Sequence, residues 1–305
     1  MDYSFQAHIL VGPTAVGKTA TAHLLATRMN ARILSADSML VYKGMDIGTA
    51  KPSRKELELF DYAGVDIVEA GERFNLNRYL EHCRTALYAE QRPVIAVGGT
   101  GLYIKALTRG LDDAGAPNSN LRALAEKLLD ENGVAALQEY LAEHAPDAYA
   151  RLKDKQNPRR LVRALESDPA TKAGWDERPA PRMAGLCMQR ERLAKRIVAR
   201  VDHMYAAGLL DEVSRLLDSG RLSRTAQQAI GYKEAIAVLA GDIDWEEARE
   251  RICARTRRLA KSQMTWFRNQ EEVDWIELSG SESLADVADR VEDIWRKHGR
   301  SRLGI

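Results

Sequence analysis

The first third of the 305-residue chain alternates continuous apolar runs with segments whose apolar residues recur every three or four positions. Continuous apolar runs indicate buried strands, whereas the second spacing indicates amphipathic helices. The runs predict strands at residues 7–11, 32–36, 65–68 and 93–97. The periodic segments predict helices near 18–29, 53–60 and 75–90. This alternation is typical of a mostly parallel sheet covered by helices.

The pattern changes after Gly110. Residues 111–120 are loop-like, and the segment that follows contains helical patterns without strands. The predicted helices of this segment are 121–132, 134–144, 146–152 and 158–167. A second break, at 168–181, holds three prolines and one glycine. Beyond it we expect a strand at 183–188, helices near 191–218, 225–240 and 245–268, a strand at 273–278 and a helix at 284–298.

Composition excludes several classes of protein. The 45 basic and 44 acidic residues give a net charge of +1, which by itself indicates no polyanionic partner. The three cysteines are far apart, which excludes a common zinc module and argues against a disulfide framework. No run approaches the roughly 18 apolar residues of a membrane span, and no basic-then-apolar leader precedes the first strand. We therefore expect a soluble, cytoplasmic monomer without a membrane partner.

A phosphate-binding motif follows the first predicted strand. The segment GPTAVGKT fits G-x-x-x-x-G-K-[ST], the P-loop, in its required setting between a strand and a helix. Its residues are Gly12, Pro13, Thr14, Ala15, Val16, Gly17, Lys18 and Thr19. Its backbone N–H groups and Lys18 would contact phosphate oxygens, and the Thr19 hydroxyl can hold Mg²⁺. The motif alone does not say whether the phosphates belong to a nucleotide.

The motif and the hydrophobic pattern together predict the fold class. We expect an α/β fold with a P-loop NTPase-like, mostly parallel sheet flanked by helices and interrupted by a helical insertion domain. The predicted core comprises residues 1–111 and 183–305, and the insertion comprises residues 112–182.

Two further strand ends carry candidate chemistry. Asp37 follows the second predicted strand, where a carboxylate beside the P-loop could accept a proton or help hold Mg²⁺. The plainer interpretation of Asp37 is a loop or N-cap residue. The strand at 93–97 ends in Gly98-Gly99-Thr100, where many P-loop NTPases have an acid. This difference argues against a motor or switch ATPase and offers the Thr100 hydroxyl to a phosphate. The alternative is a tight turn.

Residues 44–52 form a glycine-containing segment with a threonine and a lysine. On chemistry alone, a second anion-contacting loop and an ordinary turn are equally good interpretations.

Basic residues gather in two segments, 157–163 and 251–270. In the second, helical spacing puts Arg251, Arg255 and Arg258 on one stripe, which Lys261 and Thr265 continue. A solvated basic face is the plainer interpretation. Two such faces, with Trp266 and Phe267 available for stacking, favour RNA.

The chain resembles the bacterial tRNA dimethylallyltransferases (isopentenyltransferases) in a series of segments that run in family order over nearly its whole length. They are GPTAVGKT, DSMLVYKGMDIGTAKP (37–52), GGTGLYIKAL (98–107), NPRRLVRAL (157–165), AAGLLDEVSRLL (206–217), AIGYKE (229–234) and RLAKSQMTWFR (258–268). The second segment is by itself far more diagnostic than a P-loop.

The resemblance implies transfer of a dimethylallyl group from dimethylallyl diphosphate to N6 of the adenine 3′-adjacent to the anticodon, tRNA position 37, in tRNAs that read U-initial codons. Diphosphate is released. The P-loop, Gly12 to Thr19, would hold the donor's diphosphate, with Mg²⁺ as cofactor. The resemblance assigns catalytic roles to Asp37 as base, to Thr100 and Lys18, and to Arg190 as an added positive charge.

The resemblance also implies contacts with the anticodon stem-loop of tRNA. They map to Asp37, Ser38, Met39, Leu40, Thr100, Arg122, Arg159, Arg160, Leu161, Val162, Arg163, Gln228, Gly231, Tyr232, Lys233, Lys261, Gln263, Trp266 and Arg268. The chain departs from the family after Leu165, where the segment is short and rich in proline, and at Ser262, where the family often has arginine. No C-terminal zinc finger is present, as in the bacterial branch.

Three alternatives stand beside this prediction. A small-molecule kinase would use the P-loop on ATP–Mg²⁺ and Asp37 as its base, but the missing acid after residue 97 and the basic helix count against it. A prenyltransferase acting on free adenine nucleotides resembles the same family, and the basic segments argue against it. A non-enzymatic RNA-binding module would need neither Asp37 nor the P-loop.

Overall fold

The computed structural model describes residues 5–88, 92–110, 118–166, 180–220 and 222–305. The chain divides into two compact units, residues 1–110 with 178–305, and residues 111–177. The first unit, the α/β unit, contains the P-loop, and the second is the helical unit. We predicted the insertion at 112–182: residue 112 lies outside the described residues, and Arg182 is already the first residue of β7 in the α/β unit.

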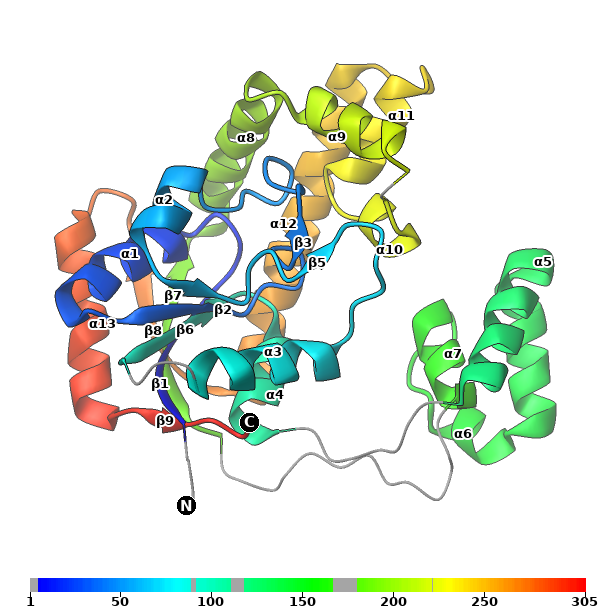
Figure 1. The fold of residues 1–305 in the computed structure, drawn as a ribbon, viewed down its shortest axis with the longest axis horizontal. Helices are drawn as coiled ribbons and strands as arrows, with labels where there is room; N and C mark the ends of the chain where they lie inside the picture. The colour runs from blue at the N-terminus through cyan, green and yellow to red at the C-terminus, as the bar shows by residue number, and fades with distance from the viewer. Residues whose placement is uncertain (1–4, 89–91, 111–117, 167–179, 221) are drawn as a thin grey trace. The chain divides into compact units, whose positions relative to one another are not determined.

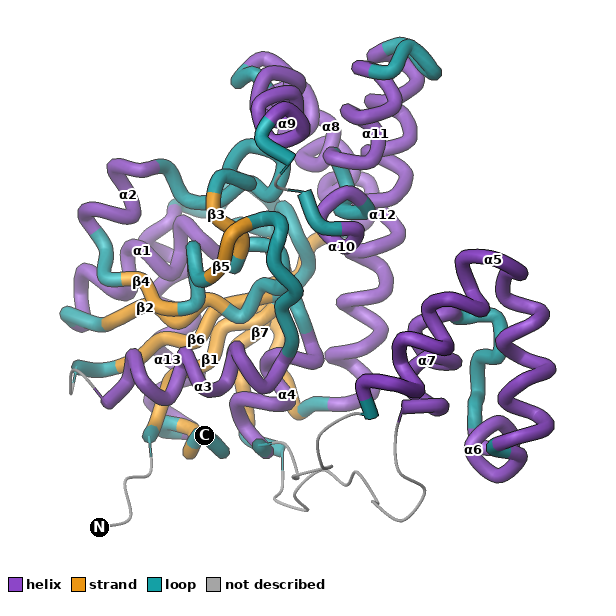
Figure 2. The backbone as a smooth tube through the Cα atoms, turned by 45° about the vertical axis from the view of Figure 1, so that its right-hand side comes forward, coloured by secondary structure: helices purple, strands orange, loops and turns teal. Residues whose placement is uncertain are grey.

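A central sheet organises the α/β unit (Figures 1 and 2). Its strands run in the order β4-β2-β6-β1-β7-β8, every pair on this path is parallel, and β9 pairs antiparallel with β1. The strands are β1 (Gln6–Val11), β2 (Arg32–Ser35), β4 (Tyr62–Ala63), β6 (Val94–Gly98), β7 (Arg182–Met188), β8 (Glu272–Leu278) and β9 (Ser301–Arg302). Val11 pairs with Gly98 and Ser35 with Val97, so β1, β2 and β6 end at one edge. Ligands bind at this edge in open α/β sheets.

Helices cover both faces of the sheet. On one side α1 (Lys18–Met29) packs against α13 (Leu284–His298). On the other, α4 (Gly101–Arg109) contacts both α3 (Leu76–Tyr88) and α12 (Trp245–Gln270). Apolar strand residues between the layers have no exposed surface, as at Leu10, Ile33, Ile95 and Leu186. Burying each such side chain contributes about 1.5–3 kcal/mol, which holds the strand ends in fixed register.

One predicted strand was wrong. Residues 65–68 do not extend the central sheet, whose edge strand is β4 instead. Gly64 and Asp66 both have positive φ, 83° and 51°, which breaks the extended backbone. The chain then forms β5 (Val68–Glu69), which pairs with β3 (Tyr42–Lys43) in a separate two-stranded sheet. The short helix α2 (Arg54–Leu59) lies between β3 and β4 along the chain.

Two predicted long helices are each divided by a glycine. The helix predicted at 191–218 is α8 (Arg190–Ala206) and α9 (Leu209–Asp218), separated at Gly208, whose φ is 93°. The helix predicted at 225–240 is α10 (Arg224–Gln227) and α11 (Tyr232–Leu239), separated before Gly231, whose φ is 94°. Gly208 directly follows the C-cap of α8 in the left-handed conformation that ends a helix, whereas Gly231 is the N-cap at which α11 begins.

The helical unit has its own core. It contains α5 (Ser119–His144), α6 (Pro146–Arg151) and α7 (Pro158–Glu166), and no strand occurs among its described residues. Gly133, with φ 77° and ψ −172°, kinks α5 between the two helices that the pattern predicted. Leu137, Leu141 and Leu161 are fully buried between α5 and α7. Most of the predicted break at 168–181 lies outside the described residues.

Candidate active site

The P-loop joins β1 to α1 with the backbone that its two glycines permit. Gly12 has φ 148°, and a Cβ there would lie 2.4 Å from the carbonyl oxygen of Leu186. Gly17 has φ 115° and directly precedes α1. Lys18 folds back over the loop, and its Nζ donates to the carbonyl oxygens of Gly12, at 2.9 Å, and Pro13, at 2.8 Å. The ammonium therefore lies where a phosphate cradle needs positive charge.

Burial lowers the pKa of Lys18 to about 8; the Asp37 carboxylate opposes this shift and the Arg200 guanidinium adds to it. Asp37 likewise opposes the lowering of the Arg200 pKa by burial. The Asp37 carboxylate thus acts electrostatically on both Lys18 and Arg200, at the sheet edge where β1 and β2 end.

Helix α8 directs two arginines at the P-loop. Arg196 Nη1 donates to the Val16 carbonyl oxygen at 2.8 Å, and Arg200 Nη1 donates to Thr14 Oγ1 at 3.3 Å. Arg190, which we predicted to add a positive charge, is exposed at the start of α8 and among the described residues has no hydrogen bond to the loop, so its role stays a prediction. Arg196 and Arg200 lie four residues apart on one face of α8, which lets both reach the loop. Their i, i+4 spacing was a readable signal that the sequence interpretation missed.

Asp37 and Thr100 lie on neighbouring strand ends. A Cβ at Gly98 would lie 2.2 Å from the Ala36 carbonyl oxygen, so the glycine lets the two chains approach. Thr100 Oγ1 accepts a hydrogen bond from the Ser38 N–H at 3.2 Å. Asp37 Oδ1 accepts one from the Met39 N–H at 2.9 Å, and no described residue donates to Oδ2. Asp37 is thus oriented as a loop carboxylate and keeps one oxygen for a substrate.

Helix α12 closes one side of the site with two side chains. Gln263 Oε1 accepts from the Thr14 N–H at 2.9 Å, and a Cβ at Gly99 would lie 2.4 Å from Gln263 Nε2. A Cβ at Gly101 would lie 2.1 Å from Trp266 Cε3. We predicted Gln263 and Trp266 as tRNA contacts. The structure places Gln263 against the P-loop and the partly exposed Trp266 against the start of α4.

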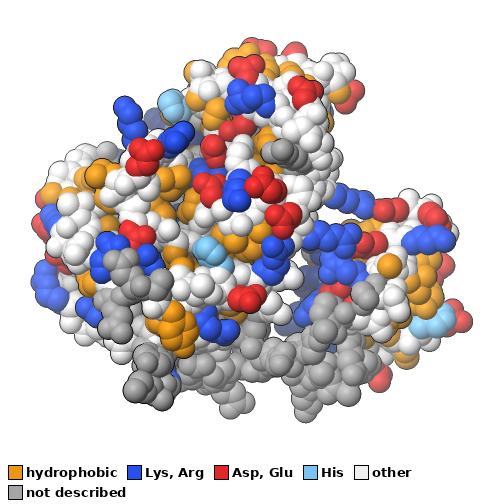
Figure 3. All heavy atoms as spheres, viewed as in Figure 1, with side chains coloured by type: hydrophobic (Ala, Val, Ile, Leu, Met, Phe, Trp, Pro, Cys, Tyr) orange, Lys and Arg blue, Asp and Glu red, His pale blue; other side chains and the backbone are white. Residues whose placement is uncertain are grey.

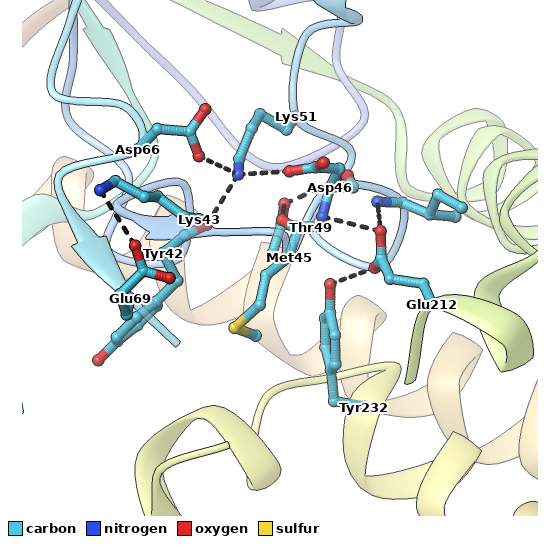
Figure 4. Close-up of polar contacts among 11 residues, drawn as sticks. Tyr42, Lys43, Met45, Asp46, Thr49, Lys51, Asp66, Glu69, Glu212 and Tyr232 are labelled. Atoms are coloured by element: carbon cyan, nitrogen blue, oxygen red, sulfur yellow. Dashed lines mark hydrogen bonds and ion pairs between the residues drawn. The ribbon is translucent and has the colours of Figure 1, made fainter. Parts of the chain in front are cut away.

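The loop at 44–52 does contact an anion, and the anion belongs to the protein (Figure 4). Glu212 of α9 accepts hydrogen bonds from three consecutive N–H groups, at residues 46–48, and from the Tyr232 hydroxyl. Tyr232 has no exposed surface, so its predicted contact with tRNA is corrected to a contact within the fold. Sequence interpretation missed Glu212, which the hydrophobic pattern placed inside a single predicted helix at 191–218.

The predicted RNA-facing residues of α12 and its neighbours separate into paired and exposed groups. Arg255 pairs with the buried Glu234 and donates to the Gln228 carbonyl oxygen, and Arg251 pairs with Glu247. The exposed residues are Gln228, Lys233, Arg258, Lys261 and Arg268, while Gly231 is buried and Ser38, Met39 and Leu40 are partly exposed. The exposed cations remain available to a polyanion.

The helical unit shows the same division. Leu161 and Val162 belong to its core, which corrects their predicted contact with tRNA. Glu166, whose side chain is 3% exposed, pairs with both Arg122 and Arg163. Arg159 and Arg160 are exposed at the start of α7. In Figure 3 basic side chains lie on the described surface of this unit together with exposed acids.

In the part of the chain that the structure describes, no helix combines the length and apolar character needed to span a membrane.

The comparisons with known proteins match nearly the whole chain. A family model described as IPP transferase matches residues 40–270, and one described as isopentenyl transferase matches residues 5–62. The chain is 39% identical to a tRNA dimethylallyltransferase of Geobacillus kaustophilus over 301 residues, which cover 94% of each protein. A solved tRNA isopentenylpyrophosphate transferase of Bacillus halodurans is 35% identical, with a TM-score of 0.68 over 96% of this chain and 97% of that one. A corresponding structure from Staphylococcus epidermidis is 32% identical, with a TM-score of 0.65 over 95% and 99%. The chain therefore belongs to the IPP transferase family, the family of the tRNA dimethylallyltransferases.

Proposed function

We propose that this chain transfers a dimethylallyl group from dimethylallyl diphosphate to N6 of the adenine that directly follows the anticodon of tRNA. The names of its relatives support a tRNA substrate. The observation that carries the finer proposal is the grouping of one carboxylate, Asp37, with Lys18 and Arg200 beside a P-loop. A cationic cradle and a single base are what this transfer needs.

The cradle suits a diphosphate that leaves. When the C1–O bond of the donor breaks, negative charge grows on the diphosphate and positive charge on the allyl group. Lys18, Arg196 and Arg200 surround the loop with three cations that stabilise the departing anion. The strand end at Gly98 carries no acid, so the turn places no negative charge against it.

The site also fits Mg²⁺ held mainly through the substrate. Thr19 is an exposed hydroxyl in the first turn of α1, and no cluster of three or more His, Cys, Asp or Glu among the described residues could enclose an ion. Mg²⁺ commonly uses few protein ligands together with substrate phosphates. Thr19 would hold the ion, which would supply further charge neutralisation on the diphosphate when bound.

Asp37 would act on the acceptor. The lone pair of an adenine N6 is delocalised into the ring, which makes the amine a weak nucleophile. As the N6–C1 bond forms, Oδ2 of Asp37 would take the N6 proton, and general-base catalysis of this kind contributes about 10²–10⁴-fold. Thr100, whose hydroxyl accepts a hydrogen bond from Ser38, would line the same position. The adenine must leave the anticodon loop to reach Asp37, which costs a few kcal/mol.

The acceptor can be tested directly. The protein is incubated with labelled dimethylallyl diphosphate and either unmodified tRNA or AMP. We expect label in tRNA and none in AMP, because the exposed cations of α7 and α12 would bind the RNA backbone. Transfer to AMP without transfer to tRNA would instead make the chain a free-nucleotide prenyltransferase.

A further inference from the structure

Glu212 is a buried carboxylate whose hydrogen-bonding capacity is fully used. It is 4% exposed. Its Oε2 accepts from the N–H groups of Asp46, at 3.0 Å, and Ile47, at 2.8 Å. Its Oε1 accepts from the Gly48 N–H at 3.2 Å and from the Tyr232 hydroxyl at 2.5 Å. Burying a carboxylate is costly unless hydrogen bonds compensate for the lost water. The four donors supply this compensation, which indicates that the position of Glu212 matters to the fold or to the site.

The loop that Glu212 holds is fixed at its other end by a second buried charge (Figure 4). The Lys51 side chain is 1% exposed, and its Nζ contacts the Tyr42 carbonyl oxygen, Asp46 Oδ1 and Asp66 Oδ1 at 2.5–2.7 Å. Gly48 rests on the ring of Tyr232, because a Cβ there would lie 2.4 Å from Cε2. Residues 46–51 therefore have little freedom to move.

This loop reaches the P-loop through one arginine. The Thr49 carbonyl oxygen accepts from Arg200 Nη2 at 3.1 Å, and Nη1 of the same guanidinium donates to Thr14 Oγ1 at 3.3 Å. A chain of contacts thus runs from Tyr232 and Glu212 through residues 46–49 to Arg200 and the P-loop. Arg200 would adopt a different direction if the Thr49 carbonyl moved.

We propose that Glu212 is a positioning residue for the donor: it fixes residues 46–48 so that the Thr49 carbonyl directs Arg200 at the diphosphate. Glu212 itself touches no substrate in this arrangement. The proposal rests on the proposed use of the P-loop for the donor's diphosphate, and it adds a residue from α9 to the determinants of donor binding.

The first experiment replaces Glu212 by glutamine in the full chain. Gln keeps the size of the side chain, but its NH₂ group would face an N–H donor that cannot accept. We expect the KM for dimethylallyl diphosphate to rise about tenfold, the effect of one or two lost hydrogen bonds, with the KM for tRNA changed less than twofold. A merely structural role would lower kcat through loss of folded protein and leave both KM values unchanged.

The matched control is Glu271→Gln. Glu271 is also a buried carboxylate of the α/β unit, and it pairs with Arg109 at the end of α4. We expect this variant to be destabilised, with a normal KM for the donor. Tyr232→Phe keeps the carboxylate and removes a single donor to it. If Glu212→Gln does not fold, a donor KM raised in Tyr232→Phe supports the proposal and an unchanged one overturns it.

A double-mutant cycle with Arg200→Ala tests the route of action. If Glu212 acts through Arg200, the double variant has the donor KM of Arg200→Ala alone, because the second change has nothing left to disturb. Independent, multiplying effects would overturn the proposal. Absence of any prenyl transfer by the unmodified protein would instead contradict the proposed function.

Discussion

Lys18 is the residue whose charge we expect to set the pH range of donor binding. Its pKa is lowered to about 8, so the free enzyme loses this positive charge as pH rises through that value. A dianionic or trianionic diphosphate binds the protonated form, and its affinity therefore decreases above pH 8. We expect the affinity for inorganic diphosphate, measured by calorimetry from pH 6.5 to 9.5, to fall on the alkaline side.

The control is Lys18→Arg, whose guanidinium stays charged over this range, so that its profile reports the titration of the ligand alone. Arg200→Ala removes a cation that lowers the pKa of Lys18. In this variant the alkaline decrease in diphosphate affinity should therefore occur at a higher pH than in the unmodified enzyme. Coinciding profiles for the unmodified enzyme and the Lys18→Arg variant would exclude titration of Lys18 as the cause.

Asp37→Asn preserves the shape of the side chain and its acceptor for the Met39 N–H, but it removes the proposed base. We expect kcat to fall by about 10²–10⁴ at pH 7, with the Kd for tRNA unchanged. Single-turnover transfer and a filter-binding assay measure the two quantities. A variant that keeps most of its rate would remove Asp37 from the base role.

At the scale of elements, α12 combines a packed face with an exposed basic face. Gln263 and Trp266 pack at the active site, and Arg255 forms an ion pair with Glu234. Arg258 and Lys261 are exposed, so they remain for phosphate contacts. We expect Arg258→Ala and Lys261→Ala each to weaken tRNA binding and to lower the slope of log Kd against log salt by about 0.7–0.9.

Arg257→Ala is the matched control on the same helix, since Arg257 is exposed about 100° away from Arg258. It should change neither the affinity nor the slope. Equal losses at all three positions would mean that α12 supplies only a diffuse positive field.

Features that adjacent residues specify could be predicted from the sequence, whereas features that depend on distant contacts could not. The P-loop and the Asp37 strand end were predicted, because a strand, a glycine turn and a helix are specified by adjacent residues. The helix breaks at Gly208 and Gly231 were missed, because the apolar spacing continues across them. Arg196, Arg200 and Glu212 were also missed, since the P-loop and the loop residues 46–49 that they contact lie more than 150 residues away along the chain.

At the scale of the whole molecule, the P-loop and the exposed arginines of α7 belong to separate compact units. The helical unit was predicted from the loss of strand pattern after Gly110, and it has its own core. The sequence could not show that Leu161 and Val162 serve this core, because they lie within a basic motif. Arg159 and Arg160 are the exposed cations at the start of α7.

We expect the double change Arg159→Glu and Arg160→Glu to lower tRNA affinity at least tenfold at low salt, because each reversal adds repulsion to a lost phosphate contact. The KM for the donor should stay normal, since the P-loop belongs to the other unit. Arg151→Glu, at an exposed arginine of α6, controls for charge alone. Equal losses from both variants would argue against a specific contact by α7.

The most direct test of the central claim asks which group the P-loop enzyme transfers. Unmodified tRNA is incubated in parallel with dimethylallyl diphosphate labelled in the allyl group and with ATP labelled in its γ-phosphate, and the digested RNA is analysed. Our account predicts allyl label on the adenine after the anticodon, one diphosphate released per transfer, and no label from ATP. Phosphate transfer from ATP, with no allyl transfer, would contradict it.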